Sequence, residues 1–283
     1  MTSAFSASTH SLASQRIAIL GCGNLGESLL AGLLKQGHEP QLLSASSRRP
    51  ERQQALTARY RVLASADNRA LAAAADIVVL AVKPKQMAEC CRELATLTLA
   101  GKLLVSVAAG IRTDQLARWL GQPVALVRSM PNTPASIGLA ATGLFATGVS
   151  ASQQALAEQL FASIGRSAWL ADEPLMDLVT AVAGSGPAYY FAIMEAFVAS
   201  AIRQGMDPAT ADLLVRQTAL GACQLAVQAD APPLAALRQQ VTSPGGTTEA
   251  ALRTLAERDL AGILDAGLKA AVARGRELAA ASD

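Results

Sequence analysis

The first half of the chain alternates short apolar runs with segments whose apolar residues recur at helical spacing. Residues 16–20 (RIAIL) form one such run, and the leucines of residues 27–37 (ESLLAGLLKQG) then follow a helical period. Residues 41–46 predict a second strand. Alternating strands and amphipathic helices favour a largely parallel sheet with helices on both faces. Three further runs predict strands: residues 77–82 (IVVLAV), 102–110 (KLLVSVAAG) and 123–130 (PVALVRSM).

The pattern changes after residue 165, and we predict no strand beyond residue 170. Long segments rich in Ala and Leu predict helices instead. The sequence therefore predicts an α/β N-terminal domain followed by an all-α C-terminal domain. We place a flexible tail at residues 1–14, the α/β domain at 15–166 and the helical domain at 167–283. The expected helices of the second domain cover residues 172–182, 188–205, 208–229, 234–240 and 248–276.

Composition narrows the classes of protein. The 283 residues are 51% hydrophobic, and 24 basic against 22 acidic residues give a net charge of +2. This balance exerts no strong attraction on nucleic acid or anionic membranes. No uncharged apolar run approaches the ~18 residues of a membrane-spanning helix. We expect neither nucleic acid nor membrane as a partner.

The cysteines and the first residues favour a cytoplasmic protein. The polar opening, residues 1–15, lacks the apolar stretch of a signal peptide. No C-x-x-C pair is present, so reduced thiols are the simplest interpretation, and no metal site is expected. The four cysteines are Cys22, Cys90, Cys91 and Cys223.

A glycine fingerprint lies directly between the first predicted strand and the first predicted helix. In Gly21-x-Gly23-x-x-Gly26, the first glycine suits a tight turn and the second a close approach of backbone to a pyrophosphate. The third lets the helix pack on the strand. The free N–H groups of the helix start, at Asn24 and Leu25, would face the anion. With strands on both sides, this motif predicts a Rossmann-type dinucleotide site.

The end of the second strand bears on the choice of cofactor. An NAD site usually places Asp or Glu there to accept from the ribose hydroxyl, whereas this chain has Ser46, Ser47, Arg48 and Arg49. Hydroxyls and guanidinium groups suit a 2′-phosphate. The alternative is a solvated basic turn. We expect NADPH as cofactor, with NADH as the alternative.

Two other strand ends should face the same ligand, because ligands of open α/β sheets lie outside the carboxyl ends of the strands. Small residues there would let a flat nicotinamide lie against backbone. Asn68 is expected on the adenosine side, while Lys83 has a solvent-facing lysine as its alternative. The expected cofactor contacts from these turns are Ala81, Val82, Lys83 and Pro84, together with Val107, Ala108 and Ala109.

Acid–base groups are scarce. The histidines, His10 in the tail and His38 before the second strand, lie away from any expected cleft, and the helical domain has a single lysine, Lys269. Reduction of a neutral carbonyl usually needs a positioned acid. A protonated imine already carries the charge that attracts hydride, so its reduction depends more on orientation. The composition of the expected cleft favours an imine substrate.

The stretch VTSPGGTTEAAL, residues 241–252, interrupts the helical domain with Pro and two glycines. A helix that starts near Thr247 or Thr248, after Gly245-Gly246, presents free N–H groups that bind a carboxylate as readily as a phosphate. Hydroxyls of Ser243, Thr247 and Thr248 add further donors and acceptors. The alternative is an ordinary capped helix start. In a chain short of acid–base groups, we favour a substrate-carboxylate site.

Residues 237–257, LRQQVTSPGGTTEAALRTLAE, closely resemble the signature of pyrroline-5-carboxylate reductases. Residues 184–189 (GSGPAY), 81–84, 107–110 and 130–132 (MPN) resemble further motifs of that family in the same order. The resemblance implies NAD(P)H-dependent reduction of 1-pyrroline-5-carboxylate to L-proline, the last step of proline biosynthesis. It also implies a homodimer formed through the helical domain, with dimers that often assemble into decamers.

The resemblance implies roles for individual residues. Thr248 is similar to the catalytic hydroxyl that meets the ring nitrogen, and Gly245, Gly246 and Thr247 would hold the substrate carboxylate through backbone N–H groups. Glu173 matches an acidic position near the active site in some members. Its alternative is a first-turn glutamate beside Pro174 that the helix dipole favours.

Two other functions compete with this one. A β-hydroxyacid dehydrogenase shares the two-domain plan but needs a lysine shortly after a Gly-x-Gly turn. This chain has Tyr189-Tyr190-Phe191 there, and no lysine follows until Lys269. A non-catalytic NADP-binding protein explains the glycine fingerprint but not residues 241–252.

Overall fold

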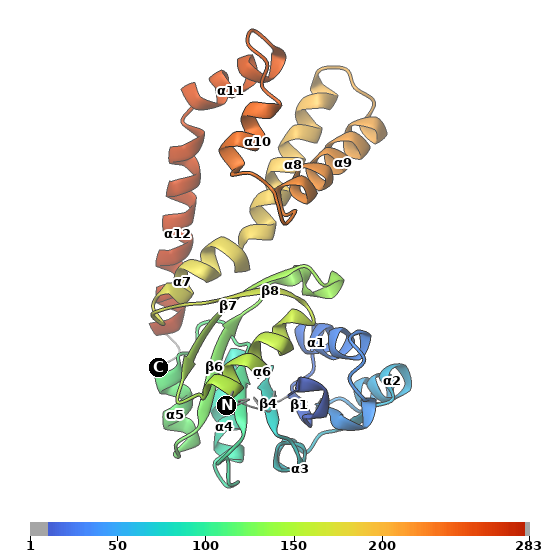
Figure 1. Ribbon diagram of the computed structural model, residues 1–283, viewed down its shortest axis with the longest axis vertical. Helices are drawn as coiled ribbons and strands as arrows, with labels where there is room; N and C mark the ends of the chain where they lie inside the picture. The colour runs from blue at the N-terminus through green and yellow to red at the C-terminus, as the bar shows by residue number, and fades with distance from the viewer. Residues whose placement is uncertain (1–10, 281–283) are drawn as a thin grey trace, which may run out of the picture. The chain divides into compact units, whose positions relative to one another are not determined.

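The computed structural model describes residues 11–280. Residues 1–10 of the expected tail, with His10, lie outside the described residues. The chain forms two compact units, of which the first comprises Met1–Ser185 with Val272–Asp283 and the second Gly186–Ala271. Each unit is described by itself (Figure 1).

The first unit contains one eight-stranded sheet with the order β3-β2-β1-β4-β5-β6-β7-β8. All neighbouring strands are parallel except β6 and β7, which are antiparallel. The expectation of a largely parallel sheet is therefore confirmed. The strands are β1 Ile17–Leu20, β2 Leu43–Ser46, β3 Leu63–Ser65, β4 Ile77–Leu80, β5 Leu103–Ser106, β6 Ala125–Met130, β7 Ala140–Thr147 and β8 Gly165–Trp169.

Helices cover both faces of this sheet because alternate residues of each central strand point to opposite sides. Ile17 and Ile19 of β1 belong to one buried cluster, which includes residues of α1 and α6. Ala18 and Leu20 belong to the other, which includes residues of α3, α4 and α5. The helices of the first unit are α1 Asn24–Lys35, α2 Pro50–Tyr60, α3 Asn68–Ala74, α4 Pro84–Leu94, α5 Thr113–Leu120, α6 Ala151–Ala162 and α7 Leu175–Val179.

Three strands were absent from the sequence-based prediction: β3, β7 and β8. β7 reads AATGLFAT, with Gly143 where a Cβ atom would lie 2.7 Å from Cγ1 of Val179. β8 is one of the two edge strands, and its residues are half-buried or exposed. Neither has the continuous apolar run that reveals a buried parallel strand. The expected border between residues 166 and 167 falls inside β8.

The end of the expected tail belongs to the first unit. Leu12–Ser14 form a 3₁₀ helix, and Leu12 is buried in the core. The backbone N–H of Leu12 donates to Oε1 of Gln159 at 3.0 Å. A buried apolar side chain and a hydrogen bond to α6 therefore fix residues that the polar sequence around them assigned to the tail.

The second unit is helical, as predicted. Its helices are α8 Gly186–Arg203, α9 Pro208–Ala226, α10 Leu234–Gln240, α11 Thr247–Glu257 and most of α12 Leu260–Ala280. The helix expected over residues 248–276 is two helices, because Asp259 adopts φ +55° between them. The Asp259 carboxylate then accepts the N–H of Gly262 at 3.1 Å and caps α12.

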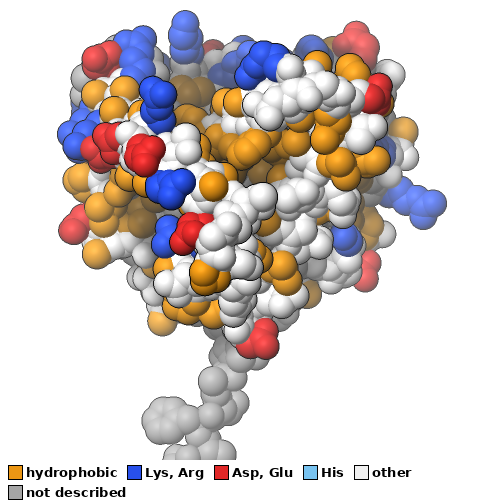
Figure 2. Space-filling view, turned by 90° about the horizontal axis from the view of Figure 1, so that it is seen from above, with side chains coloured by type: hydrophobic (Ala, Val, Ile, Leu, Met, Phe, Trp, Pro, Cys, Tyr) orange, Lys and Arg blue, Asp and Glu red, His pale blue; other side chains and the backbone are white. Residues whose placement is uncertain are grey.

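Very little of the second unit is buried. Within residues 186–271, all of which the structure describes, only Gly186 and Ala211 are buried. Large apolar side chains remain exposed, including Phe197 at 58% and Leu213 at 64%. Hydrophobic side chains are also visible on the surface drawn in Figure 2. An exposed apolar surface of this extent marks an interaction face.

Candidate active site

Each of the three glycines of the fingerprint meets a different structural requirement. Gly21 adopts φ +78°, and a Cβ atom there would lie 2.6 Å from Cγ1 of Val82. A Cβ atom at Gly23 would have its nearest neighbour 3.9 Å away, so the backbone is open to a ligand. A Cβ on Gly26 would lie 3.0 Å from Cγ2 of Ile19, where α1 packs on β1. These are the turn, the open approach and the helix–strand contact of a dinucleotide site.

Ser46 supports this turn from the neighbouring strand. Its hydroxyl accepts the N–H of Gly21 at 2.8 Å and donates to Oδ1 of Asn68 at 2.6 Å. The Ser46 carbonyl accepts the N–H of Cys22 at 2.7 Å, and Asn68 donates to Glu93 at 3.1 Å. The Ser46 side chain is buried. Its hydroxyl is therefore engaged within the protein, which differs from the expected contact with a cofactor phosphate.

The start of α1 presents backbone N–H groups without a side-chain cap. Gly23 is the N-cap residue and makes no side-chain hydrogen bond. Asn24 is exposed and Leu25 is half-buried at this helix start. The positive end of the helix dipole and these N–H groups form a site that favours an anion.

Arg48 and Arg49 lie at the surface between β2 and α2, where the sequence predicted a 2′-phosphate contact. Within residues 11–280 neither guanidinium forms an ion pair or a side-chain hydrogen bond. Ser47 accepts the N–H of Arg49 at 3.3 Å and shapes this turn. The two guanidinium groups are therefore available to a phosphate.

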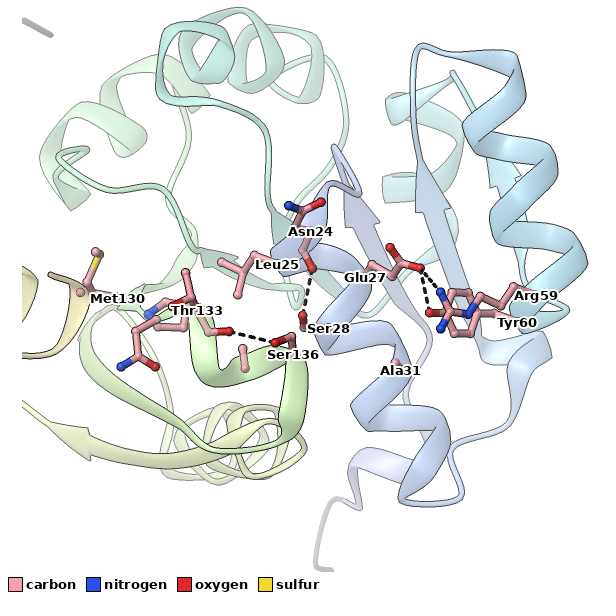
Figure 3. A pocket seen from close by; sticks show the side chains of 14 residues that line it. Asn24, Leu25, Glu27, Ser28, Ala31, Arg59, Tyr60, Met130, Thr133 and Ser136 are labelled. Carbon is pink, nitrogen blue, oxygen red and sulfur yellow. Dashed lines mark hydrogen bonds and ion pairs between the residues drawn. The ribbon is translucent and has the colours of Figure 1, made fainter. Parts of the chain in front are cut away.

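A charged cluster joins α1 to α2 beside this site. The Glu27 carboxylate accepts from Arg52 at 2.6 Å, Tyr60 at 2.8 Å and Arg59 at 3.1 Å. Figure 3 shows Glu27 facing Arg59 and Tyr60. Burial alone would raise the pKa of Glu27, but the hydrogen bonds from Arg52 and Tyr60 and the nearby guanidinium charges lower it below its ordinary value.

A cleft of about 690 Å³ lies along α1 in the first unit (Figure 3). One wall is the end of β6 and the 3₁₀ turn after it, residues 130–136. Asn132 fixes this wall, since its side chain donates to the Ala183 carbonyl and accepts the N–H of Ala141, both at 3.0 Å. The candidate residues did not include this wall, although its MPN motif belonged to the family resemblance.

The predicted strand-end turns meet at one edge of the sheet, because β1, β4 and β5 are parallel neighbours. After β4, Ala81 and Val82 are half-buried, while Lys83 and Pro84 are exposed at the start of α4. In the turn after β5, Val107 and Ala108 are buried, Ala109 is exposed, and Gly110 adopts φ +77°. The sheet thus brings both turns to the edge that carries the glycine turn.

The candidate substrate residues of the second unit lie at the start of α11. The Gly245 N–H donates to Oε2 of Glu249 at 2.7 Å, and the Gly246 N–H donates to the Ser243 carbonyl at 3.0 Å. Both groups are therefore used inside the turn, contrary to the expectation that they bind substrate. Among the described residues, the N–H groups of Thr247, Thr248 and Glu249 have no acceptor. The three N–H groups open to an anion are therefore two residues further along than the three expected ones.

Glu173 is bonded within the first unit. Its carboxylate forms an ion pair with Arg128 at 2.9 Å and accepts both the N–H and the hydroxyl of Thr113, at 2.8 and 2.6 Å. Arg128 is only 4% exposed. These contacts favour a structural role over the substrate contact that the family resemblance implied.

Neither Cys22 nor the described histidine, His38, is placed to act as an acid or base in the cleft. Burial raises the pKa of Cys22, in the glycine turn, to about 12, which keeps the thiol neutral. Burial lowers the pKa of His38, whose Nε2 lies 3.0 Å from the Gln15 carbonyl. Lys269 pairs with Asp265 on the surface of α12. None of these groups is a general acid at the cleft.

The glycine turn, the uncapped start of α1 and the sheet edge define a dinucleotide-dependent oxidoreductase of the Rossmann class. Residues 16–110 match the family described as NADP oxidoreductase, coenzyme F420-dependent. Residues 173–278 match the family described as pyrroline-5-carboxylate reductase dimerisation. The chain belongs to the pyrroline-5-carboxylate reductase family.

Similar proteins span nearly the whole chain. The pyrroline-5-carboxylate reductase of Pseudomonas aeruginosa is 42% identical, covering 95% of this chain and 98% of its own length. That of Vibrio alginolyticus is 41% identical, with coverage of 93% and 97%. The solved structure of a pyrroline-5-carboxylate reductase from Coxiella burnetii has a TM-score of 0.90 at 39% identity, with coverage of 94% and 98%. Within residues 11–280, no helix combines the length and apolar character needed to cross a membrane.

Proposed function

We propose that this chain reduces 1-pyrroline-5-carboxylate to L-proline with NADPH, the final step of proline biosynthesis. Membership of the family supports the reaction. The observation that carries the proposal is the set of three successive N–H groups at Thr247, Thr248 and Glu249. They lie at the start of α11 and have no acceptor among the described residues. Such a helix start suits the carboxylate of a small acid.

The residues of the first unit fit a dinucleotide. Gly21 can take its conformation only without a side chain, and Gly23 leaves space for a phosphate. We assign the pyrophosphate to the N–H groups of Asn24 and Leu25. Bound NADPH supplies the hydride that reaches the imine carbon.

The guanidinium groups of Arg48 and Arg49 would hold the 2′-phosphate, with Ser47 beside them. Arginine suits this role because its planar donors match phosphate oxygens. Ser46 and Asn68 would act on the cofactor indirectly. The Ser46 hydroxyl holds the Gly21 N–H, and Asn68 in turn holds the Ser46 hydroxyl. Residues 81–84 and 107–109 are proposed to contact the rest of the cofactor at the sheet edge.

At the substrate, Thr247, Thr248 and Glu249 would hold the carboxylate through their N–H groups. The Thr248 hydroxyl would orient the ring nitrogen, with Ser243 as a further polar neighbour. The imine nitrogen is protonated before transfer and keeps its proton, so hydride addition at carbon gives the neutral amine without a strong acid from the chain. This mechanism depends on orientation, in agreement with the absence of such an acid among the cleft residues described.

The exposed apolar surface of the second unit supports a homodimer. Helices with only two buried residues among them gain their core by packing on a second copy. The matched dimerisation family covers this region. Assembly of the dimers into a decamer, and a cytoplasmic location, are parts of the same proposal. Light scattering of the purified protein distinguishes a dimer from a decamer.

The test is an absorbance assay of NADPH oxidation with 1-pyrroline-5-carboxylate and with a series of β-hydroxyacids and NADP⁺. We expect imine reduction that yields proline, identified by amino-acid analysis, and little oxidation of hydroxyacids. Oxidation of hydroxyacids without imine reduction would overturn the assignment.

A further inference from the structure

The Glu173 carboxylate, through its ion pair with Arg128 and its hydrogen bonds from Thr113, joins three separate parts of the first unit. Arg128 lies on β6, Glu173 precedes α7, and Thr113 is the first residue of α5. One carboxylate receives the Arg128 Nη1 donor at 2.9 Å, the Thr113 N–H at 2.8 Å and the Thr113 hydroxyl at 2.6 Å. The Arg128 and Thr113 side chains are buried.

Both chain segments that this carboxylate joins lead directly to the candidate active site. Residues 107–112 form the turn after β5, and Thr113 follows them directly, so the carboxylate fixes the end of that turn. Only Ser129 separates Arg128 from Met130 on β6, and Met130 lines the cleft along α1. Ser129 in turn donates its hydroxyl to the Ser106 carbonyl at 2.8 Å, which joins β6 to β5.

Close packing fixes only part of this region, because Val107, Ala108 and Ile111 are buried in the core while Ala109 is exposed. A cavity of about 460 Å³ adjoins the pair and is lined by Arg112, Arg128, Glu173, Asp177 and Arg276, among others. Arg112 is the residue of the turn that lines this cavity, and Gly110 within the turn adopts φ +77°. Directional hydrogen bonds therefore add to the contacts of the buried residues in setting the position of the turn: Thr113 donates to Glu173, and the Arg112 N–H donates to Oε1 of Gln115 at 2.8 Å.

Stability alone does not account for such a pair. Burial of two charges costs solvation free energy, and apolar residues of similar volume often stabilise a protein equally well. A carboxylate with three donors on two segments instead defines a unique geometry. Hydride transfer is sensitive to geometry of this kind, because a displacement of ~1 Å can reduce the rate about a hundred-fold.

We propose that Glu173 is a positioning residue, which acts through Thr113 and Arg128 to hold residues 107–112 and the end of β6 in register for hydride transfer. The inference rests on the proposed function, in which residues 107–109 contact the cofactor beyond its phosphates; the end of β6 lies on the strand next to β5 and lines the cleft along α1. Glu173 contacts neither substrate nor cofactor in this scheme.

The test compares three variants with a matched control. Glu173→Gln removes the charge, Thr113→Val removes one hydrogen bond and keeps the shape of the side chain, and the double variant R128M/E173L replaces the pair with apolar residues that suit a buried site. The control is Asp177→Asn, because Asp177 lines the same cavity and pairs with Arg276 at 3.6 Å without contact to Thr113.

Three quantities are measured on each protein: amide hydrogen exchange of residues 107–113, the hydride-transfer rate with 4-deuterated NADPH, and affinity for 2′-phospho-ADP-ribose, the cofactor fragment without nicotinamide. We expect faster exchange and about ten- to a hundred-fold slower transfer in Glu173→Gln and in the double variant. Thr113→Val should show a smaller change in the same direction. Fragment affinity should stay within about twofold of the wild type, since the fragment binds at the other end of the site.

The double variant separates positioning from folding. If it melts at or above the wild-type temperature and still transfers hydride slowly, stability cannot explain the loss. Wild-type exchange and wild-type transfer in a folded Glu173→Gln or double variant would overturn the inference, as would equal changes in Asp177→Asn. A wild-type protein that reduces no imine would contradict the proposed function instead, while the exchange measurement would still test whether Glu173 holds the turn.

Discussion

The Ser46 hydroxyl accepts the backbone N–H of Gly21 at 2.8 Å, across 25 residues of sequence. This bond fixes the turn from the neighbouring strand, and the same hydroxyl donates to Asn68. The conformation of the glycine turn thus depends on a side chain outside the fingerprint.

Replacement of Ser46 by alanine should therefore weaken both the fold and cofactor binding. A partly buried N–H left without an acceptor costs about 1–3 kcal/mol. We expect a lower melting temperature and a weaker shift of that temperature by NADP⁺. Ser44→Ala, on the same strand, is the control and should behave as the wild type. If the two variants match, the bond does not stabilise the turn.

Replacement of Arg48 and Arg49 by alanine should raise the KM for NADPH far more than the KM for NADH. The loss of charge-assisted contacts to a 2′-phosphate costs about 1.5–3 kcal/mol, or roughly ten- to a hundred-fold. Steady-state kinetics with both cofactors measures the difference. Arg166→Ala, an exposed arginine on β8, controls for loss of positive charge. Equal effects on both cofactors would show that the turn does not recognise the phosphate.

Thr248→Ala should lower kcat/KM for the imine and leave NADPH affinity nearly unchanged. The loss of one hydrogen bond to the ring nitrogen costs about 1–3 kcal/mol, or roughly five- to a hundred-fold. The Thr248 side chain makes no hydrogen bond among the described residues, so the melting temperature should change little.

Thr254→Ala is the control on the same helix, where the hydroxyl donates only to the Ala250 carbonyl at 3.1 Å. A Thr248→Ala variant that is destabilised yet keeps its kcat/KM would assign Thr248 to the start of α11 alone.

Glu27 should make stability depend on acid pH. Burial would raise its pKa, but the bonds from Arg52 and Tyr60 outweigh burial and lower it in the folded state. A lowered pKa contributes stability above the ordinary value of 4.5, and this contribution is lost as the pH falls through the folded-state pKa. Glu27→Gln should therefore be less stable than the wild type near neutral pH, with the difference narrowing as the pH falls through the lowered pKa of Glu27.

Urea unfolding midpoints at several pH values measure this difference. Glu51→Gln, an exposed first-turn residue of α2, is the control. A Glu27→Gln difference that stays constant down to acid pH would mean that its carboxylate pairing contributes nothing.

Phe197→Glu should disrupt assembly through the second unit. Phe197 is 58% exposed on α8 in the single chain, and a charge buried against a second copy is costly. We expect a smaller mass by light scattering and reduced helix content by circular dichroism. Leu63→Glu, at a similarly exposed apolar residue of the first unit, should leave the mass unchanged. An unaltered mass for Phe197→Glu would place the interface elsewhere.

Local sequence patterns predicted those features of the fold that depend on residues close together in the sequence. Gly21 and Gly26 are explained by a turn and a helix packing on the strand that precedes it. The central strands are apolar throughout because both faces are buried. By contrast, β7 consists mainly of small residues, and Gly143 is required by Val179, far along the chain.

Hydrogen-bond partners of the candidate site were not predictable from the sequence in the same way. Gly245 and Glu249 are four residues apart, yet nothing in their spacing says whether the carboxylate or a ligand receives the N–H. Ser46 and Glu173 are engaged by partners from distant segments. A motif indicates which groups are present, while the fold decides which remain available.

The strand order also sets the sequence in which the ligand sites can form during synthesis. Ile17 pairs with Leu43 and Ser44 pairs with Leu63, so β1, β2 and β3 can form a half-sheet before β4 leaves the ribosome. We expect a nascent chain to acquire the phosphate-binding turn first, then the two strand ends at the nicotinamide, and the carboxylate site of α11 last. A chain truncated before α11 would thus bind the cofactor but lack the residues proposed to hold the substrate.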